Sequence, residues 1–324
     1  MRIAPLLLAA FLMPYGLAAL TPGGRLDALH ALRQGRADEA YAVLQLAIER
    51  NSQDAEAQQL FCRLSLQLER WDDAVSACDK AVALDGSSSD NHLWYGRALG
   101  EKADRVSFIK AYGLGKRVKV EFETAVALDP HNAEALSDLG EFYTDAPALL
   151  GGGKDKAADI ARRLDSIDRA RAEELRGRIA AGNRDTAAAE QHFRDAIAAA
   201  APRSAGYWMV LGSFYQKQND LQRMQQAIRS GLEADGAHGE PLVDAAHLLT
   251  RSGQDPETAI RLLREYLASP DKSEDEPAFR VHLMLAGLLS RQGDAAGAAR
   301  EIQAASAIAS IYHPTKQVAT NTGR

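Results

Sequence analysis

A pattern of residues that recurs about every 34 positions constrains the fold of this chain more than any other feature of its sequence. Residues 133–143 and 205–215 both carry a Leu-Gly pair, a Tyr three positions after the Gly and a large apolar residue three positions before the Leu. Apolar residues spaced three and four positions apart lie on one face of an α-helix. The two segments are therefore predicted to be amphipathic helices, and their recurrence indicates a repeat protein.

A second type of segment follows the first along the chain. Residues 73–85 and 122–130 carry alanines and other apolar residues on one helical face and then reach a residue that ends a helix. Ala40 and Ala74, which belong to this second type, are 34 residues apart. One repeat is thus predicted to be a hairpin of two antiparallel helices. Because a single hairpin cannot bury its own apolar stripe, successive hairpins are expected to stack.

Together the two segments resemble the tetratricopeptide repeat (TPR), whose first helix carries W-x₂-L-G-x₂-Y and whose second carries A-x₃-F-x₂-A before a proline. The resemblance covers residues 25–312 and implies an all-α fold, a right-handed α-solenoid (a TPR-like superhelix) of antiparallel helix pairs. The predicted domain spans residues 20–312 and contains about eight hairpins. These are expected to start near Thr21, Ala55, Ser89, Ala133, Ala170, Ala205, Gly239 and Phe279.

Two segments interrupt the period. About ten extra residues lie around 103–113 in the third unit, before its second helix reaches Phe122. About five extra residues lie within 146–153 in the fourth unit, between its two helices. These insertions are expected to lengthen the third unit and the helix connection of the fourth, and the repeat pattern assigns them no role.

The first residues have the features of a signal peptide over 1–19. A positive charge at Arg2 is followed by an apolar run at 3–13 and by small residues that suit cleavage after Ala18 or Ala19. The apolar run is too short to be a permanent membrane anchor. The sequence therefore predicts an exported protein of bacterial type that is periplasmic or secreted and has no integral membrane segment after cleavage.

The charges of the chain are mixed along its length. There are 38 basic and 44 acidic residues, which give a net charge of −6. Both signs alternate, as at 117–123, and this is typical of solvated helix surfaces. Nucleic acid is not expected as a partner, because duplex binding usually needs a clustered basic face. The polar residues 313–324 are predicted to form a disordered tail.

The sequence carries no complete motif for catalysis, for a cofactor or for a metal. The Gly-Gly-Gly-Lys stretch at 151–154 lacks the first glycine, the following Ser or Thr and the preceding strand of a P-loop. The histidines do not share metal-ligand spacing with a Cys or carboxylate, and His192 is interpreted as a helix-surface residue. The chain is therefore predicted not to be an enzyme, and neither a cofactor nor a metal is expected.

The two cysteines, Cys62 and Cys78, fall in one hairpin at the Gly position of the first helix and the Phe position of the second. Export would permit a disulfide between them. Packed helix axes lie about 8–10 Å apart, and an offset of about 4.5 Å along the hairpin separates the pair further. Their Cα atoms are thus expected near or beyond the limit for a bridge, which predicts two free buried thiols.

In TPR solenoids the first helix of each pair lines a concave groove, which usually takes a peptide, a helix or an extended segment. The resemblance implies five groove-facing positions in each unit. In the fourth unit these are Glu134, Ser137, Glu141, Thr144 and Asp145. In the sixth unit they are Gly206, Met209, Ser213, Gln216 and Lys217. The Lys and Asn set with which the family's best-known clamp binds a C-terminal carboxylate is missing.

The sequence thus favours a non-catalytic protein–protein interaction scaffold or assembly factor of the cell envelope, which binds a protein or peptide partner in the concave groove. One alternative is the substrate-recognition subunit of an envelope enzyme complex, or an uncharacterised enzyme. A catalytic role would require clustered polar residues in one deep cleft. Another is a self-assembling structural protein, which size-exclusion chromatography would reveal.

Overall fold

The computed structural model describes residues 22–234 and 238–313, and the regular structure in these ranges is entirely helical. The signal peptide predicted at 1–19 lies outside the described residues, and so does the predicted tail apart from His313. The first four pairs consist of α1 (Pro22–Arg33) with α2 (Ala37–Arg50), α3 (Ala55–Gln67) with α4 (Trp71–Leu84), α5 (Ser89–Ala103) with α6 (Phe108–Leu128), and α7 (Ala133–Asp145) with α8 (Lys154–Leu164). The other four consist of α9 (Arg169–Gly182) with α10 (Thr186–Ala200), α11 (Ala205–Lys217) with α12 (Leu221–Glu233), α13 (Glu240–Arg251) with α14 (Pro256–Ala268), and α15 (Ala278–Arg291) with α16 (Ala295–Ile308).

The predicted all-α solenoid of helix pairs is confirmed, and the first helix of each pair starts within one residue of the position that the repeat predicts. Capping side chains define several of these starts. The Asp54 carboxylate accepts a hydrogen bond from the Ala57 N–H, and the Asn132 side chain accepts one from the Ala135 N–H, both at 3.0 Å. Among the described residues, none of the helices combines the length and apolar character that a membrane span requires.

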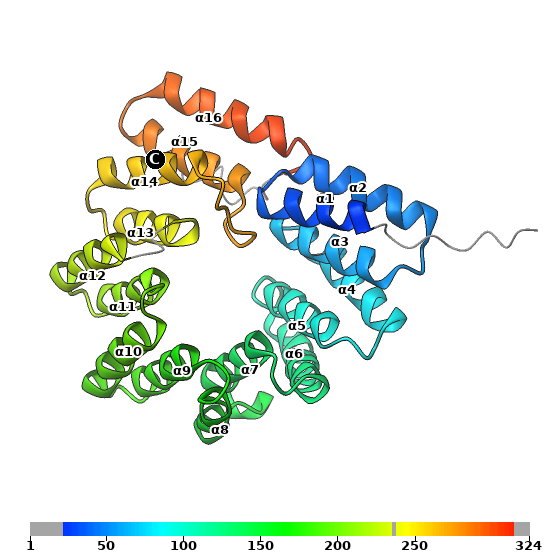
Figure 1. Cartoon of the computed structure of the whole chain (residues 1–324), viewed down its shortest axis with the longest axis horizontal. Coiled ribbons are helices and arrows are strands. Elements are labelled where there is room, and N and C mark those ends of the chain that lie inside the picture. The colour runs from blue at the N-terminus through cyan, green and yellow to red at the C-terminus, as the bar shows by residue number, and fades with distance from the viewer. Residues whose placement is uncertain (1–21, 235–237, 314–324) are drawn as a thin grey trace, which may run out of the picture.

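The helix pairs follow one another around a ring (Figure 1). On one side of the ring, α7, α9, α11 and α13 lie toward the centre, and their partners α8, α10, α12 and α14 lie outside. The last pair, α15 and α16, returns to the first two pairs, from which it is farthest in the sequence. The first helices of the pairs therefore form an inner surface.

Direct contacts between the two ends of the repeat array close the ring. Phe279 of α15 belongs to a buried cluster with residues of α1, α2 and α3, and the Tyr312 hydroxyl donates a hydrogen bond to the Glu69 carboxylate at 3.0 Å. The Asp38 carboxylate accepts hydrogen bonds from the backbone N–H groups of Ser310 (2.8 Å) and Ile311 (3.2 Å). In an open superhelix each repeat contacts only its neighbours along the chain. The contacts between the first and last pairs therefore show that this chain forms a closed ring and not an open superhelix.

Within two of the pairs, a glycine of the first helix packs against a phenylalanine of the second. A Cβ added to Gly96 would lie 2.4 Å from Phe122 Cε1, and one added to Gly177 would lie 2.6 Å from Phe193 Cε1. The aromatic ring therefore occupies the space that a side chain at the glycine would need. This is the close helix crossing that the repeat pattern predicts.

Cys62 and Cys78 occupy the corresponding Gly and Phe positions of α3 and α4, and they form a disulfide with their Cα atoms 5.3 Å apart. The prediction of two free thiols is therefore wrong. That prediction used the spacing of helix axes, which is about 8–10 Å. Because each Cα lies about 2.3 Å from its own axis, residues that face each other across the crossing can be only about 5 Å apart.

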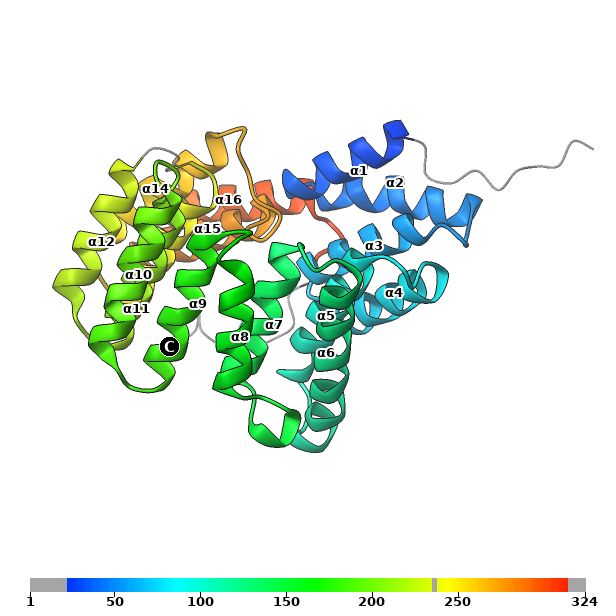
Figure 2. The ribbon, with the colours of Figure 1, turned by 60° about the horizontal axis from the view of Figure 1, so that its bottom comes forward.

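The two insertions pack against each other (Figure 2). α6 contains 21 residues, whereas the second helices of the other pairs contain between 11 and 15. The fourth pair has a 3₁₀ helix, η1 (Ala148–Leu150), between its two helices. A Cβ added to Gly115 of α6 would lie 2.9 Å from Leu150 Cδ1, so the Leu150 side chain lies directly over this glycine.

Candidate interaction surface

The five groove positions predicted in the fourth pair lie on α7, which is on the inner side of the ring. Glu134 and Asp145 are exposed, and Glu141 is half-buried. The Thr144 hydroxyl donates to a carbonyl of its own helix (2.9 Å), and the buried Ser137 Oγ has no hydrogen-bond partner among the described residues. The accessible part of this surface is therefore acidic.

Two arginines from neighbouring pairs neutralise part of this acidic surface. Arg97 of α5 donates to Asp138 (2.6 Å) and to Glu134 (3.1 Å). Arg178 of α9 lies 3.4 Å from a Glu141 oxygen and also pairs with a glutamate of its own helix. Burial raises the pKa of the Glu141 carboxyl, and the charge of Arg178 opposes this shift. Glu141 is therefore already paired in the free protein.

In the sixth pair, three of the predicted groove residues, Ser213, Gln216 and Lys217, belong to α11, which lies on the inner side of the ring. Ser213 and Lys217 of α11 line a cavity of 380 Å³ together with Asp145 and Arg178. Lys217 is exposed, and the half-buried Gln216 donates from its side-chain amide to a carbonyl of α13 (3.0 Å). This cavity joins the inner surfaces of the fourth, fifth and sixth pairs.

The assignment of Met209 to the groove is wrong. Its side chain is 3% exposed and belongs to the hydrophobic core. A Cβ added to Gly231 of α12 would lie 2.4 Å from Met209 Cε, so the missing side chain of Gly231 leaves space that the flexible methionine fills. Gly206, the other predicted groove residue of this pair, is not packed against the core, because an added Cβ there would meet no atom within 4 Å.

The segment 269–277, between α14 and α15, covers inner residues of the second and third pairs. Arg63 of α3 forms two hydrogen bonds with the Glu274 carboxylate, at 2.8 and 2.5 Å, and both side chains are largely buried. The guanidinium groups of Arg63 and Arg97 lie over the Trp94 ring, 4.7 and 4.6 Å from its centroid. The segment therefore narrows the inner surface of the second and third pairs, where hollows of 580 and 560 Å³ remain beside it.

An apolar pocket of 550 Å³, here called the insertion pocket, lies between the third and fourth pairs. Its walls come from the C-terminal ends of α5 and α7, from α6 and from residues 146–150. Its apolar lining includes Phe108, Ala111, Tyr112, Phe142, Leu149 and Leu150. Asp145 lines both this pocket and the 380 Å³ cavity, so the two hollows adjoin at that residue. The repeat period predicts the positions of the two insertions, but no pattern in the sequence indicates the pocket between them.

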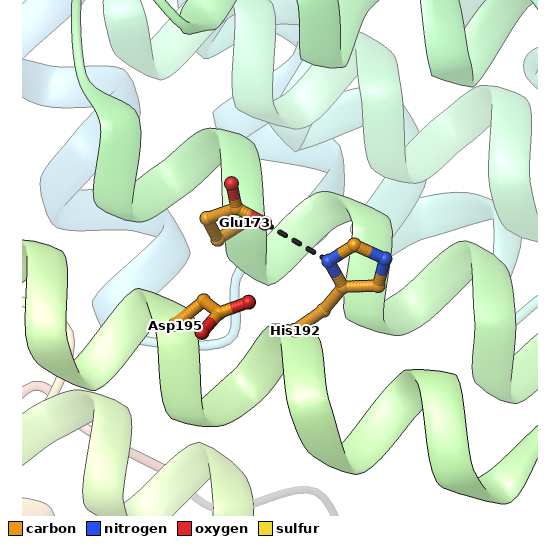
Figure 3. Close-up of side chains that lie close together, drawn as sticks. All are labelled: Glu173, His192 and Asp195. Carbon is orange, nitrogen blue, oxygen red and sulfur yellow. Dashed lines mark hydrogen bonds and ion pairs between the residues drawn. The ribbon is translucent and has the colours of Figure 1, made fainter.

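Glu173 of α9 and His192 and Asp195 of α10 bring three possible metal-ligand atoms within 4.8 Å of one another (Figure 3). His192 Nδ1 lies 2.9 Å from a Glu173 oxygen, and Arg176 donates to the other Glu173 oxygen at 3.0 Å. The guanidinium charge beside Glu173 opposes a second cation there. The hydrogen bond between His192 and Glu173 joins α10 to α9, and the His192 side chain is half-buried.

Asp244 of α13 lies in an acidic part of the inner surface. Burial raises the pKa of its carboxyl to about 7, with further upward contributions from Glu240 and Glu276. His247 and Arg251 act in the opposite direction. The folded protein therefore holds a proton at Asp244 between about pH 4 and pH 7, where the unfolded chain has lost it.

We expect Asp244→Asn to raise the free energy of unfolding by roughly 2 kcal/mol at pH 8 and to have little effect at pH 4. Because the carboxyl pKa of Asp244 is raised in the folded parent protein, its contribution to the free energy of unfolding falls as the pH rises from about 4 to 7. The asparagine amide does not titrate, so the variant does not lose this stability. Thermal melts of both proteins across this range test the expectation. A constant difference in melting temperature at all pH values would contradict it.

Comparison with known proteins supports the repeat and the fold. Residues 31–99 and 174–238 match two family models, both described as tetratricopeptide repeat. Among solved structures, the chain is similar to a thermophilic TPR protein of Thermus thermophilus, with 18% identity and a TM-score of 0.51 over 60% of this chain and 98% of that one. It is also similar to a TPR protein from Parabacteroides merdae, with 12% identity and a TM-score of 0.49 over 83% and 96%.

A search of curated proteins finds no match to the sequence. The family matches confirm the resemblance over 134 residues, 69 in the first stretch and 65 in the second. Beyond these stretches the helix pairs continue with the same architecture. The chain is therefore an all-helical α-solenoid of helix pairs that carries tetratricopeptide repeats and is similar in fold to TPR proteins.

Proposed function

We propose that this protein is a non-catalytic scaffold or assembly factor of the cell envelope, which binds a protein partner along the inner surface of its fourth to sixth helix pairs. TPR repeats suggest a role in protein–protein interaction. The observation that carries the proposal is the position of Asp145, which lines two adjoining hollows of 550 and 380 Å³. A partner segment lying along α7 and α11 would contact both.

The envelope location rests on the N-terminal sequence and is supported by the disulfide. Residues 1–19 have the charge, apolar run and small residues of a signal peptide. Disulfides persist in oxidising compartments such as the bacterial periplasm and are rare in the cytosol. The bridge between Cys62 and Cys78 therefore favours a protein that folds outside the cytoplasm.

A charge swap on the inner surface tests the proposed function. Asp145→Lys combined with Lys217→Glu reverses two exposed charges of the surface and leaves the net charge unchanged. Glu141 is not suitable, because its carboxylate is paired with Arg178. We expect the swapped protein to lose its partner in crosslinking pull-downs from the native envelope, with less than about 0.5 kcal/mol change in stability.

The matched control is the same swap on the outer surface of the ring. Arg229→Glu with Glu233→Lys exchanges two exposed charges of α12, and this variant should capture the partner as the parent does. The proposal fails if the inner swap captures the same proteins as the outer one, or if the parent protein captures none.

A further inference from the structure

The insertion pocket is built by the two segments that break the repeat period. The N-terminal part of α6 supplies Phe108, and η1 supplies Leu149, and these two side chains are 83% and 72% exposed. Ile109, next to Phe108, is also 83% exposed. Exposed large apolar side chains around an apolar hollow mark an interaction site.

The charged residues that line the insertion pocket are all carboxylates. Asp138 and Glu141 are paired with Arg97 and Arg178, but the exposed Asp104 and Asp145 have no hydrogen bond or ion pair to their side chains among the described residues. The pocket rim therefore carries two carboxylates without a direct ion pair beside apolar walls, and Arg178, which lines the adjoining cavity with Asp145, offsets part of the charge of Asp145.

These two unpaired carboxylates lie at the C-terminal ends of helices. Asp104 is the C-cap of α5, and Asp145 is the last residue of α7. The C-terminal end of a helix dipole is itself negative, so an acidic side chain there lowers the stability of the free protein. A cationic group from a partner would relieve this repulsion.

We propose that the insertion pocket binds an amphipathic helix of the partner protein, with large apolar side chains in the pocket and Lys or Arg beside Asp104 and Asp145. This proposal rests on the proposed function and names the class of segment that the partner presents. An amphipathic helix presents apolar side chains three and four positions apart with basic residues at their margin, which matches an apolar hollow that has acidic residues at its rim.

The charge of the rim argues against other occupants. A fatty acid or an anionic membrane surface would bring negative charge to the unpaired carboxylates. A second copy of this chain in a twofold contact would place the same acidic rim against itself. Both remain outcomes of the test below.

Two glycines allow a matched test of the pocket. Gly100 of α5 lies in a wall that the insertion pocket shares with a hollow of 580 Å³, and a Cβ added to it would meet no atom within 4 Å, so Gly100→Leu adds apolar volume at this wall without displacing the fold. Gly113 of α6 is exposed, lies outside the pocket lining and also has no atom within 4 Å of an added Cβ. Gly113→Leu is therefore the control, since both changes put leucine at a helical glycine.

The probe is a fluorescent helical peptide of about 18 residues, with Leu and Phe on one face and Lys at its margins. A second peptide carries Glu in place of each Lys. We expect the Lys peptide to bind the parent protein and Gly113→Leu equally, and Gly100→Leu at least about tenfold more weakly. The Glu peptide should bind the parent at least about fivefold more weakly than the Lys peptide.

A charge reversal tests the rim separately. Asp104→Lys should weaken the binding of the Lys peptide about fivefold. Glu233→Lys, at the exposed C-terminal end of α12, should leave its binding within about twofold. Equal binding to Gly100→Leu and the parent, or no binding of the Lys peptide to the parent, would overturn the proposal.

Two further measurements separate the alternatives. A dimer of the parent in sedimentation that Gly100→Leu abolishes, or binding of oleate to the parent that the same change removes, would also overturn the proposal by identifying a different occupant. If Gly100→Leu still captures the envelope partner while the inner charge swap does not, the proposed function stands and this inference fails. If the parent captures no partner although the Lys peptide fills the pocket, the proposed function fails instead.

Discussion

Replacing Gly35 with Ala is expected to open the ring and to lower the free energy of unfolding by roughly 2–4 kcal/mol. Gly35 lies in the turn between α1 and α2 with a φ of +64°, which L-residues adopt at a cost. An added Cβ would lie 2.1 Å from the backbone nitrogen of Ala278, at the start of α15. Because backbone cannot move aside as a side chain can, the first and last pairs must separate.

The control for this change is Gly253→Ala. Gly253 occupies the turn between α13 and α14 with a φ of +65°, and an added Cβ would meet no atom within 4 Å. It carries the same backbone cost of about 1–2 kcal/mol without any effect on closure. Small-angle scattering should show a larger radius of gyration for Gly35→Ala alone. Equal melting and equal scattering of the two variants would show that the ring does not depend on this contact.

Removing the disulfide is expected to cost about 3 kcal/mol, because Cys62 and Cys78 close a loop of 16 residues in the unfolded chain. The loss should be greatest in the second helix pair, because repeat arrays unfold in local units. Thermal melts of the parent protein with and without a reductant, and of Cys62→Ser with Cys78→Ser, measure this effect. Both treatments should lower the melting temperature by similar amounts.

The repeat itself supplies the control for the disulfide. Cys62→Gly with Cys78→Phe installs the pair that packs at Gly96 and Phe122 in the third helix pair. This variant should regain part of the lost stability and should not respond to reductant. Two free thiols per chain in the unreduced, denatured protein would contradict the bridge.

The sequence predicts those features of the fold that local packing determines. A glycine such as Gly140 allows two helices to pack closely because it has no side chain. An added Cβ there would lie 2.4 Å from Leu175 Cδ2. Such positions recur with the period, and the starts of the helix pairs follow from them. The same reasoning assigned Glu134 and Asp145 to the groove, and both side chains are exposed on α7. Gly212 is less tightly packed, since its added Cβ would come no closer than 3.0 Å to Leu248.

Features that depend on a single non-periodic residue could not be predicted from the repeat. Met209 was predicted to face the groove, but its side chain is buried in the core because Gly231 of the next helix has no side chain. The closure of the ring depends on residues more than 200 positions apart, such as Asp38 and Ser310, and no spacing in the sequence links them. The packing of segment 269–277 over Arg63 likewise depends on one distant residue, Glu274. These contacts are set by the accumulated rotation of all the repeats.

Site-specific photocrosslinking tests most directly whether the inner surface of the ring binds the partner. A photoreactive amino acid at Ser213 of α11 would sit in the 380 Å³ cavity, and one at Arg229 of α12 would sit on the outer surface. After illumination in the native envelope, the binding surface proposed here predicts one crosslinked protein from position 213 and none from position 229. Crosslinks to the same protein from position 229 alone, or from neither position, would contradict it.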